Sequence, residues 1–501
     1  MKKLSYICLA AFTFVSVISC DDNEVEEMLP ELITPGPDMM VYGLADNNQL
    51  LTFNSNNSAS ITSKAITGLS SGEKLLSIDF RPATGELYAV SNASKFYIIN
   101  TSTGNTRAVS TTAFTPTISG TIASIDFNPT VDRIRLVTNT GQNLRLHPET
   151  GALAAMDTSI ATSSSITGIA YTNSVSGATS TVLYDLDATS GKLFKQDPPN
   201  NGTLVEVGSL GITFTGQAAF DINPENTVAL MAATSGSQNS LYRVDLSNGK
   251  ATNIGNLSMK ILDLAIPTNP VAYAVNEANS IQIFNPNNPQ PVAKAITGLQ
   301  TGENILGIDF RPLNGQLYAL GSTSRIYTIN LGTGAATQVG SGQLTTLLVG
   351  TEFGFDFNPT VDKIRVVSNL GQNLRLDPIT GGVTAVDGAI NPTTITLGAA
   401  AYTNNFAGAT TTSLFVIDHS TDKLYLQNPP NNGTVVEVGS LGINITAANG
   451  FDIGSTSQKA YLLATVGSET KLYNVNTTTG AATFMSNYPN TVRGFTVGLG
   501  F

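Results

Sequence analysis

A tandem duplication constrains the fold of this chain more than any other feature. The stretch FNPTVDRIRLVTNTGQNLRLHPETG (127–151) returns as FNPTVDKIRVVSNLGQNLRLDPITG (357–381), with 19 of 25 positions identical. KAITGLSSGEKLLSIDFRPATGELYAV (64–90) returns as KAITGLQTGENILGIDFRPLNGQLYAL (294–320), and QDPPNNGTLVEVGSLG (196–211) returns as QNPPNNGTVVEVGSLG (427–442). We therefore expect two homologous domains, at residues 39–268 and 269–501.

A finer period inside each copy predicts β-propeller blades. SIDFRPATGELYAV and FYIINTSTGNTRAV each hold a β-branched and aromatic run, then a turn with Pro, Asn, Asp or Gly, then a second short strand. Together such segments make four-stranded units of about 46 residues, a length typical of blades. We count five units in each copy, and long helical patterns are absent from the sequence. The expected fold is all-β, with four-stranded blades arranged in a ring.

The junction between the copies leaves two arrangements open. The favoured one is two tandem five-bladed propellers, in which ILDLAIPTNPVAYAV (261–275) closes the first ring and opens the second. The alternative is one ten-bladed propeller, in which the same segment is a hairpin and the final VRGFTVGLGF completes the first blade. Either closure protects the edge strands that an open sheet would expose.

The N-terminus predicts an exported lipoprotein. Lys2 and Lys3 precede the apolar run LSYICLAAFTFVSVIS, which is too short and wrongly flanked for a stable membrane span, so residues 1–19 are expected to be a signal peptide. The Val-Ile-Ser that precedes Cys20 resembles the lipobox of bacterial lipoproteins. That resemblance implies cleavage before Cys20 and acylation of this cysteine.

Residues 20–38 are acidic and then proline-rich, which predicts a solvated tether without a core. An acidic run directly after the lipidated cysteine also resembles the surface-export signal of Bacteroidetes-type lipoproteins. The resemblance implies an outer membrane lipoprotein exposed at the cell surface. The alternative is a plain linker on a protein that faces the periplasm.

Composition excludes several kinds of function. The net charge is −11 and no basic stripe is present, which argues against a nucleic acid partner. Cys8 would leave with the signal peptide, so no cysteine nucleophile remains in the folded part. His147 stands where the second copy has Asp377, and His419 where the first has Ala188, so we expect both to be surface turn residues. We expect no metal site, no cofactor and no assignable catalytic residue.

Aspartates recur at the ends of the first strands of the blades. The recurrent acids are Asp79, Asp126, Asp221, Asp309, Asp356 and Asp452. The favoured interpretation is structural, with each carboxylate accepting free backbone N–H groups of a turn or pairing with an arginine of the next blade. The alternative is a ring of carboxylates that faces the channel and holds a cation or a polar ligand.

Arginine, glutamine and asparagine supply the candidate binding residues. These are Arg135, Gln142 and Asn143 in the first copy and Arg365, Gln372 and Asn373 in the second. The arginines could clamp an anion or carboxylate, or could pair with the recurrent aspartates. The Gln-Asn pairs could read a sugar hydroxyl, or could close a turn through their own side chains. PPNNG predicts a rigid long turn, a place where propellers often present ligand contacts.

The motifs IDFRPATGELYA, FDFNPTVDKIRVVSNLGQNLRLDP, AAAYTNN and GFDI resemble the secreted bacterial family described as domain of unknown function 4394. The resemblance covers both copies and implies an exported protein without an assigned activity. We expect a non-catalytic binding or interaction module at the cell envelope, with a protein or glycan partner and a lipid anchor in the membrane. A hydrolase or lyase that uses Asp and Glu in a propeller funnel, and a purely structural scaffold, are the alternatives.

Overall fold

The computed structural model describes residues 33–501, and Thr34–Phe501 form one compact unit. The expected signal peptide, Cys20 and most of the tether lie outside the described residues. The described part is all-β, and its ten sheets are all four-stranded and antiparallel. Two short 3₁₀ turns, η1 (Pro199–Asn201) and η2 (Pro430–Asn432), lie in the repeated PPNNG segments.

Five of the sheets form the first propeller, and in each the strand named first is the innermost. The blades are β20 (Asp263–Ala265), β1 (Met40–Ala45), β2 (Gln49–Asn54), β3 (Asn57–Ala65); β4 (Leu75–Phe80), β5 (Leu87–Ser91), β6 (Phe96–Ile99), β7 (Thr106–Ala108); β8 (Ala123–Asn128), β9 (Arg133–Thr138), β10 (Asn143–Leu146), β11 (Leu153–Met156); β12 (Ile166–Tyr171), β13 (Leu183–Asp187), β14 (Lys192–Gln196), β15 (Leu204–Ser209); and β16 (Ala219–Ile222), β17 (Ala229–Ser235), β18 (Gln238–Val244), β19 (Ala251–Asn256).

The other five sheets form the second propeller in the same order. The blades are β40 (Val492–Val497), β21 (Ala272–Asn276), β22 (Ser280–Asn285), β23 (Asn288–Ala295); β24 (Ile305–Arg311), β25 (Gln316–Gly321), β26 (Arg325–Ile329), β27 (Ala336–Val339); β28 (Phe353–Asn358), β29 (Lys363–Ser368), β30 (Asn373–Leu376), β31 (Val383–Val386); β32 (Leu397–Tyr402), β33 (Leu414–Asp418), β34 (Lys423–Gln427), β35 (Val435–Ser440); and β36 (Ala447–Ile453), β37 (Ala460–Val466), β38 (Glu469–Val475), β39 (Ala482–Tyr488).

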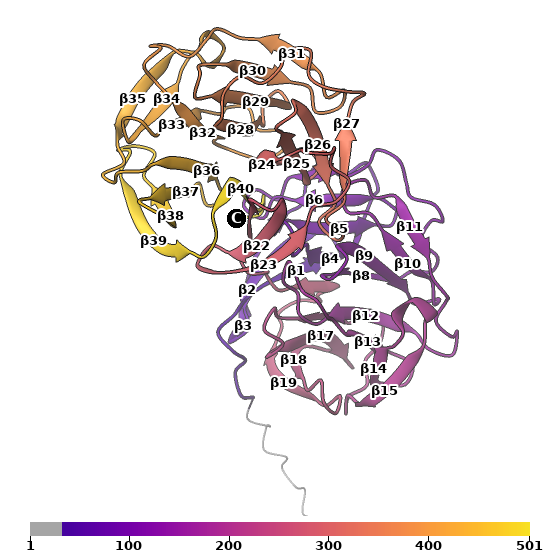
Figure 1. The fold of residues 1–501 in the computed structure, drawn as a ribbon. Helices are drawn as coiled ribbons and strands as arrows, with labels where there is room; N and C mark the ends of the chain where they lie inside the picture. The colour runs from indigo at the N-terminus through magenta and orange to yellow at the C-terminus, as the bar shows by residue number, and fades with distance from the viewer. Residues whose placement is uncertain (1–32) are drawn as a thin grey trace, which may run out of the picture. The chain divides into compact units, whose positions relative to one another are not determined.

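Each ring closes with a strand taken from the end of its own copy, which confirms the favoured arrangement of two five-bladed propellers. Strand β20 pairs with β1, where Tyr42 lies opposite Ala265, and β40 pairs with β21, where Tyr273 lies opposite Thr496. The innermost strands β4, β8, β12, β16 and β20 pack in one closed cycle, and β24, β28, β32, β36 and β40 pack in another. Figure 1 shows these two circular sets of blades, the first in indigo to magenta and the second in red to yellow.

The hydrophobic core lies between neighbouring blades. Alternate residues of a strand face opposite sides of its sheet, so each blade offers one apolar face to the blade before it and one to the blade after it. In the second blade, for example, Tyr97 and Ile99 pack toward the first blade, whereas Phe96 and Ile98 pack toward the third. Ten buried clusters of this kind hold the blades of the two rings together.

One buried carboxyl breaks this apolar pattern in the first ring only. Asp185 of β13 is completely buried, and neither of its oxygens has a hydrogen-bond partner among the described residues. Val416 occupies the same position of β33 in the second ring, where it is also completely buried. Burial raises the pKa of the Asp185 carboxyl well above its usual value, although the charge of Arg135 opposes this.

We expect Asp185→Val to raise the free energy of unfolding by about 1–3 kcal/mol at pH 7, because it removes an unpaired buried carboxyl. Urea denaturation of the full chain measures the change. The matched control is Asp187→Val, because buried Asp187 accepts hydrogen bonds from the Ser165 N–H and the Ser190 hydroxyl. This control should lower the stability, and equal losses for both variants would contradict the prediction.

Candidate functional site

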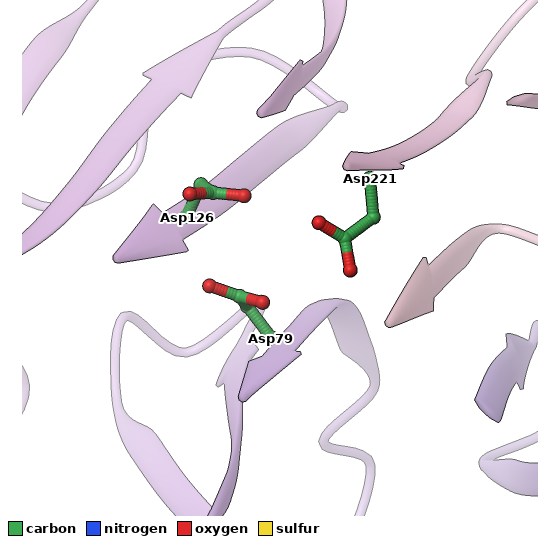
Figure 2. A group of neighbouring side chains, drawn as sticks. All are labelled: Asp79, Asp126 and Asp221. Carbon is green, nitrogen blue, oxygen red and sulfur yellow. The ribbon is translucent and has the colours of Figure 1, made fainter. Parts of the chain in front are cut away.

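The recurrent aspartates converge on the axis of each ring. In the first ring, Asp79, Asp126 and Asp221 come from three different innermost strands, and one carboxylate oxygen from each lies within 4.8 Å of the other two (Figure 2). All three side chains are buried. The counterparts in the second ring are Asp309, Asp356 and Asp452, and one oxygen from each again lies within 4.8 Å of the other two.

Each axial carboxylate accepts a backbone N–H from the neighbouring blade. Asp79 Oδ2 accepts the N–H of Phe127 at 2.8 Å, and Asp221 Oδ2 accepts that of Ile266 at 2.6 Å. In the second ring Asp309 Oδ2 accepts the N–H of Phe357 at 2.7 Å. These bonds join one innermost strand to the next, so the acids link the blades that surround the axis.

Burial and mutual repulsion favour the neutral form of these acids. Loss of solvent is the largest cause, and it raises the pKa of Asp221 to about 7 and that of Asp452 to about 6. The pKa of Asp126 is raised well above the usual value by burial and then by the nearby charges of Asp79 and Asp221. One oxygen from each acid is close enough to the others for the three to ligate one cation.

One position on the second strand of each blade shows where the third blade differs from the general repeat. The residue on the second strand that lies opposite the axial residue is aromatic in most blades, as with Tyr88, Tyr184 and Tyr318. In the third blade of each ring it is an arginine, Arg135 or Arg365. A residue that departs from the blade repeat at the same place in both copies is a candidate for a specific role.

Arg365 is buried in a hydrogen-bond network between the third and fourth blades. Its Nη1 donates to Asn373 at 2.7 Å and to Asp387 at 2.6 Å, and its Nη2 donates to Asn431 of the PPNNG turn at 2.7 Å. Its Nε donates to the Tyr402 hydroxyl at 3.3 Å. These bonds fix the fourth blade's long turn against the third blade.

Arg375 completes the network from its exposed side. Its Nε and Nη2 donate to the two oxygens of Asp387 at 2.8 and 2.9 Å, which is a bidentate ion pair. Burial disfavours ionisation of Asp387, but hydrogen bonds from Arg375 and Arg365 outweigh it and hold the pKa of this carboxyl below its usual value. Nη1 of Arg375 donates no hydrogen bond to any described residue.

A pocket of about 210 Å³ opens beside this network in the second ring. Three cationic side chains line it, namely Lys363, Arg365 and Arg375. The remaining lining residues are Asn358, Val361, Tyr402, Pro429, Pro430 and Asn431. We call this the seam pocket, because it lies at the seam between the third and fourth blades.

The first ring repeats the same contacts. Arg135 donates to Asn143 at 2.8 Å, to Asp157 at 2.6 Å and to Asn200 of the first PPNNG turn at 2.7 Å. Arg145 forms the bidentate pair with Asp157 at 2.7 and 2.8 Å. Arg133 stands at the position of Lys363, so the cationic character of the seam is kept in both copies.

The structure separates the six predicted binding residues into three groups. Arg365 lines the seam pocket, and Arg135 is its counterpart. Asn143 and Asn373 lie behind the arginines, and each donates to a carbonyl of the PPNNG turn at 3.0 Å, from Pro199 or Pro430.

The glutamines lie in a different place. Gln142 accepts the N–H of Ser119 at 3.0 Å and donates to the Thr117 carbonyl at 2.9 Å. Gln372 makes the same two bonds to residues 349 and 347. Both side chains therefore fasten the loop that leads into the third blade, and neither lines the seam pocket.

Three features differ from the expectations or were absent from them. The arginines pair with Asp157, Asp387 and other outer acids, not with the axial aspartates. Lys363, Tyr402 and Asn431 join the site, and the available signal was that the segments which hold them recur in both copies. His419 lies in a turn as expected, but its Nδ1 is 3.0 Å from Oε2 of Glu352.

A comparison with known protein families matches each of the two rings separately. The family model described as domain of unknown function (DUF4394) matches residues 49–265 and 280–496, one match for each ring. The chain belongs to this family. In this DUF4394 protein the two matches include both seams, with their arginines and their PPNNG turns.

Other comparisons add little about this DUF4394 protein. No curated protein matches its sequence. Among solved structures, the extracellular domain of a one-component system from B. thetaiotaomicron matches 89% of this chain and 59% of its own length, at 12% identity and a TM-score of 0.25. Within residues 33–501, no helix has the length and apolarity needed to cross a membrane.

Proposed function

We propose that this DUF4394 protein is a non-catalytic binding module of the cell envelope, in which the seam pocket of the second ring and the equivalent seam of the first ring each hold a ligand that carries a carboxylate. The observation that supports it is the cluster of cationic and amide side chains around Arg365, the residue that departs from the blade repeat in the third blade of both copies. Arginine and lysine offer hydrogen-bond donors and charge but are poor acids and bases at neutral pH, which suits binding better than catalysis.

The charges around the seam pocket favour an anion. Lys363, Arg365 and Arg375 line it, whereas their acidic partners Asp377 and Asp387 are not among its lining residues. Arg375 has an uncommitted Nη1, so a carboxylate can accept from it without breaking the pair with Asp387. A charge-assisted hydrogen bond of this kind contributes about 1.5–3 kcal/mol.

The rest of the lining favours an acidic sugar. Amide and hydroxyl groups of Asn358, Asn431 and Tyr402 can exchange hydrogen bonds with ring hydroxyls, while Pro429 and Pro430 offer an apolar surface to the C–H face of a pyranose. A uronic acid carries a carboxylate, hydroxyls and an apolar face on one ring. An acidic peptide shares the carboxylate and lacks the ring hydroxyls.

Calorimetric titration of the full chain with digalacturonate tests the proposal, with neutral lactose and a Glu-Glu dipeptide as the comparison ligands. Digalacturonate should bind, and binding should weaken as the salt concentration rises. Arg375→Met should weaken it about 10- to 100-fold, because one charge-assisted contact is lost. Lys423→Met is the matched control, since Lys423 pairs with Glu437 on the same ring away from the pocket.

The outcomes separate the possible ligands. Tighter binding of the dipeptide would replace the sugar by a protein partner. Failure of both acidic ligands to bind would refute the carboxylate site and favour a structural scaffold. Equal losses for Arg375→Met and Lys423→Met would show that the seam pocket is not the site.

The place of this module in the cell is part of the same proposal. We infer an outer membrane lipoprotein, anchored through acylated Cys20 and carried on the acidic tether, with the cell surface favoured over the periplasm. Support comes from the sequence, since these residues lie outside the described part of the chain. Cys20→Ala should move the protein from the membrane to the soluble fraction on cell fractionation, and continued membrane association would contradict the lipid anchor.

A further inference from the structure

A larger cavity lies where the two rings meet, away from both seams. Its volume is about 460 Å³, within the range of small-molecule sites. Tyr42 and Phe80 of the first ring line it, with their rings edge to face at 5.4 Å. Phe406 of the loop between β32 and β33 and Phe501 line it from the second ring. We call it the inter-ring cavity.

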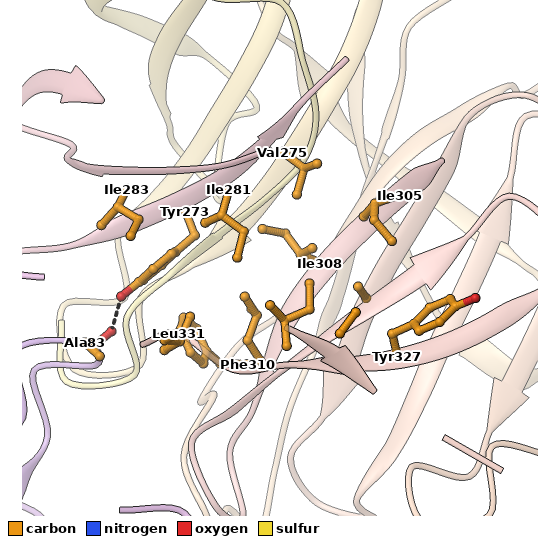
Figure 3. Close-up of a cluster of buried hydrophobic side chains, with 14 of the residues drawn as sticks. Ala83, Tyr273, Val275, Ile281, Ile283, Ile305, Ile308, Phe310, Tyr327 and Leu331 are labelled. Carbon is orange, nitrogen blue, oxygen red and sulfur yellow. Dashed lines mark hydrogen bonds between the residues drawn. The ribbon is translucent and has the colours of Figure 1, made fainter. Parts of the chain in front are cut away.

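The equivalent aromatic pair of the second ring is covered by protein. Tyr273 and Phe310 lie edge to face at 5.2 Å, and they belong to a buried cluster that includes Ala83 of the first ring and Leu499. The Tyr273 hydroxyl donates to the Ala83 carbonyl at 2.8 Å (Figure 3). One copy of the aromatic pair is therefore packed shut and the other borders a cavity.

The residues around the closed pair are apolar, whereas their counterparts around the open pair are threonines. The closed pair is surrounded by Leu331, Ala336 and Leu499, all buried in one cluster, and Leu499 also borders the cavity. Thr101, Thr106 and Thr268 occupy the corresponding positions in the first ring and line the cavity. The strand register supports the correspondence, since Ile99 lies opposite Thr106 and Ile329 lies opposite Ala336.

Thr268 fits a ligand better than it fits an empty cavity. Thr268 is buried, and its Oγ1 has no hydrogen-bond partner among the described residues. A buried hydroxyl without a partner costs about 1–3 kcal/mol, a cost that the leucine of the second ring does not carry. The amide-bearing Asn100 and Asn105 line the same cavity and add further donors and acceptors.

Charge does not dominate this cavity, in contrast to the seam pocket. Its one cationic side chain, Arg107, forms an ion pair with Glu86 at 2.8 Å and donates to the Leu313 carbonyl at 2.7 Å. Both Arg107 and Glu86 line the cavity, so their charges largely cancel there. Aromatic faces with neutral hydroxyl and amide groups are the surroundings that a neutral pyranose sugar needs.

We propose that the inter-ring cavity is a second binding site, for a neutral saccharide, in which Tyr42, Phe80 and Phe406 contact the apolar face of the sugar and the threonines bind its hydroxyls. This goes beyond the seam proposal, because the residues of the two sites do not overlap. This site needs both copies, because one ring alone does not supply all of its lining residues. The second ring supplies Phe406 and Phe501, which no single copy could place beside Tyr42.

Saturation-transfer NMR and calorimetry on the full chain test this proposal, with maltose, cellobiose and lactose as separate probes. At least one disaccharide should bind. The double variant Thr101→Leu/Thr268→Leu introduces the two leucines of the second ring, and it should weaken binding at least tenfold by filling the cavity. Thr337→Ala is the matched control, because Thr337 is the second-ring counterpart of Arg107 and does not line the cavity.

Two further measurements distinguish a filled cavity from a misfolded protein. The thermal midpoint of the double variant should equal or exceed that of the parent chain, and its affinity for digalacturonate should be unchanged, because the seam pockets are untouched. Binding of none of the three disaccharides would overturn the proposal. So would undiminished disaccharide binding by the folded double variant, whatever the seam pockets do.

Discussion

Replacing Arg365 by methionine should lower the free energy of unfolding by about 3–5 kcal/mol, the usual loss when one partner of a buried ion pair is removed. Methionine leaves Asn373, Asn431 and the Tyr402 hydroxyl without their shared donor. It also leaves Asp387, whose side chain is only 6% exposed, with Arg375 alone. Urea denaturation followed by circular dichroism measures the loss.

Two variants bracket this prediction. Tyr402→Phe removes a single hydrogen bond to Arg365 and should cost about 1 kcal/mol. Arg135→Met breaks the equivalent network in the first ring and should cost as much as Arg365→Met. A loss below about 1 kcal/mol for both arginine variants would show that the seams do not hold the blades together.

The stability of the protein should fall as the pH rises from about 4 to about 8. Burial raises the pKa of Asp452 to about 6, that of Asp221 to about 7 and that of Asp263 to about 8. The folded chain therefore keeps these protons at pH values where the unfolded chain has lost them. Each such carboxyl contributes stability that is complete below about pH 4 and is lost through its folded pKa, at about 1.4 kcal/mol per pH unit.

Asp263→Asn should flatten part of this pH profile. The change removes the titrating proton while keeping an oxygen that can accept the Ile78 N–H, which Asp263 Oδ2 now accepts at 3.0 Å. Denaturation of parent and variant at pH 5, 7 and 9 measures the difference, which should be largest at pH 9. A parent chain that becomes more stable with rising pH, and further so with added Ca²⁺, would show that the axial acids hold a cation.

The ring architecture could be predicted because each short repeat in the sequence corresponds to one blade. The two tandem copies and the four-stranded units both follow from alternating strands and glycine-containing turns. The closure was harder, since ILDLAIPTNPVAYAV has the pattern of a hairpin. Long-range pairing decides it, because Ala265 lies opposite Tyr42 and the two residues are far apart in the sequence.

The seam could be predicted only in part. Arg135 and Arg365 were candidates because arginine among apolar strand residues needs a partner. The expected partners were the axial aspartates, but these already accept N–H groups of the next blade and are held near neutrality by burial. The arginines instead reach outward to Asp157 and Asp387, which directly follow the outermost strands β11 and β31 of the same blades.

The inter-ring cavity has no signal in a single sequence. Its walls come from strands and turns of the first copy and from loops and the C-terminal segment of the second, and their meeting depends on how the rings pack. A comparison of Thr101 with Leu331, or of Thr268 with Leu499, becomes informative only after the structure shows that the two threonines line a cavity and that the two leucines belong to a buried apolar cluster. The polar substitutions in the first copy then acquire a physical meaning.

The number of digalacturonate molecules bound per chain tests the seam proposal most directly. Calorimetry of the full chain should give two sites, one in each ring. Lys363→Met/Arg375→Met should leave one site, and adding Arg133→Met/Arg145→Met should leave none. Absence of binding, or two sites that persist in all of these variants, would contradict the assignment of the seam pockets as carboxylate sites.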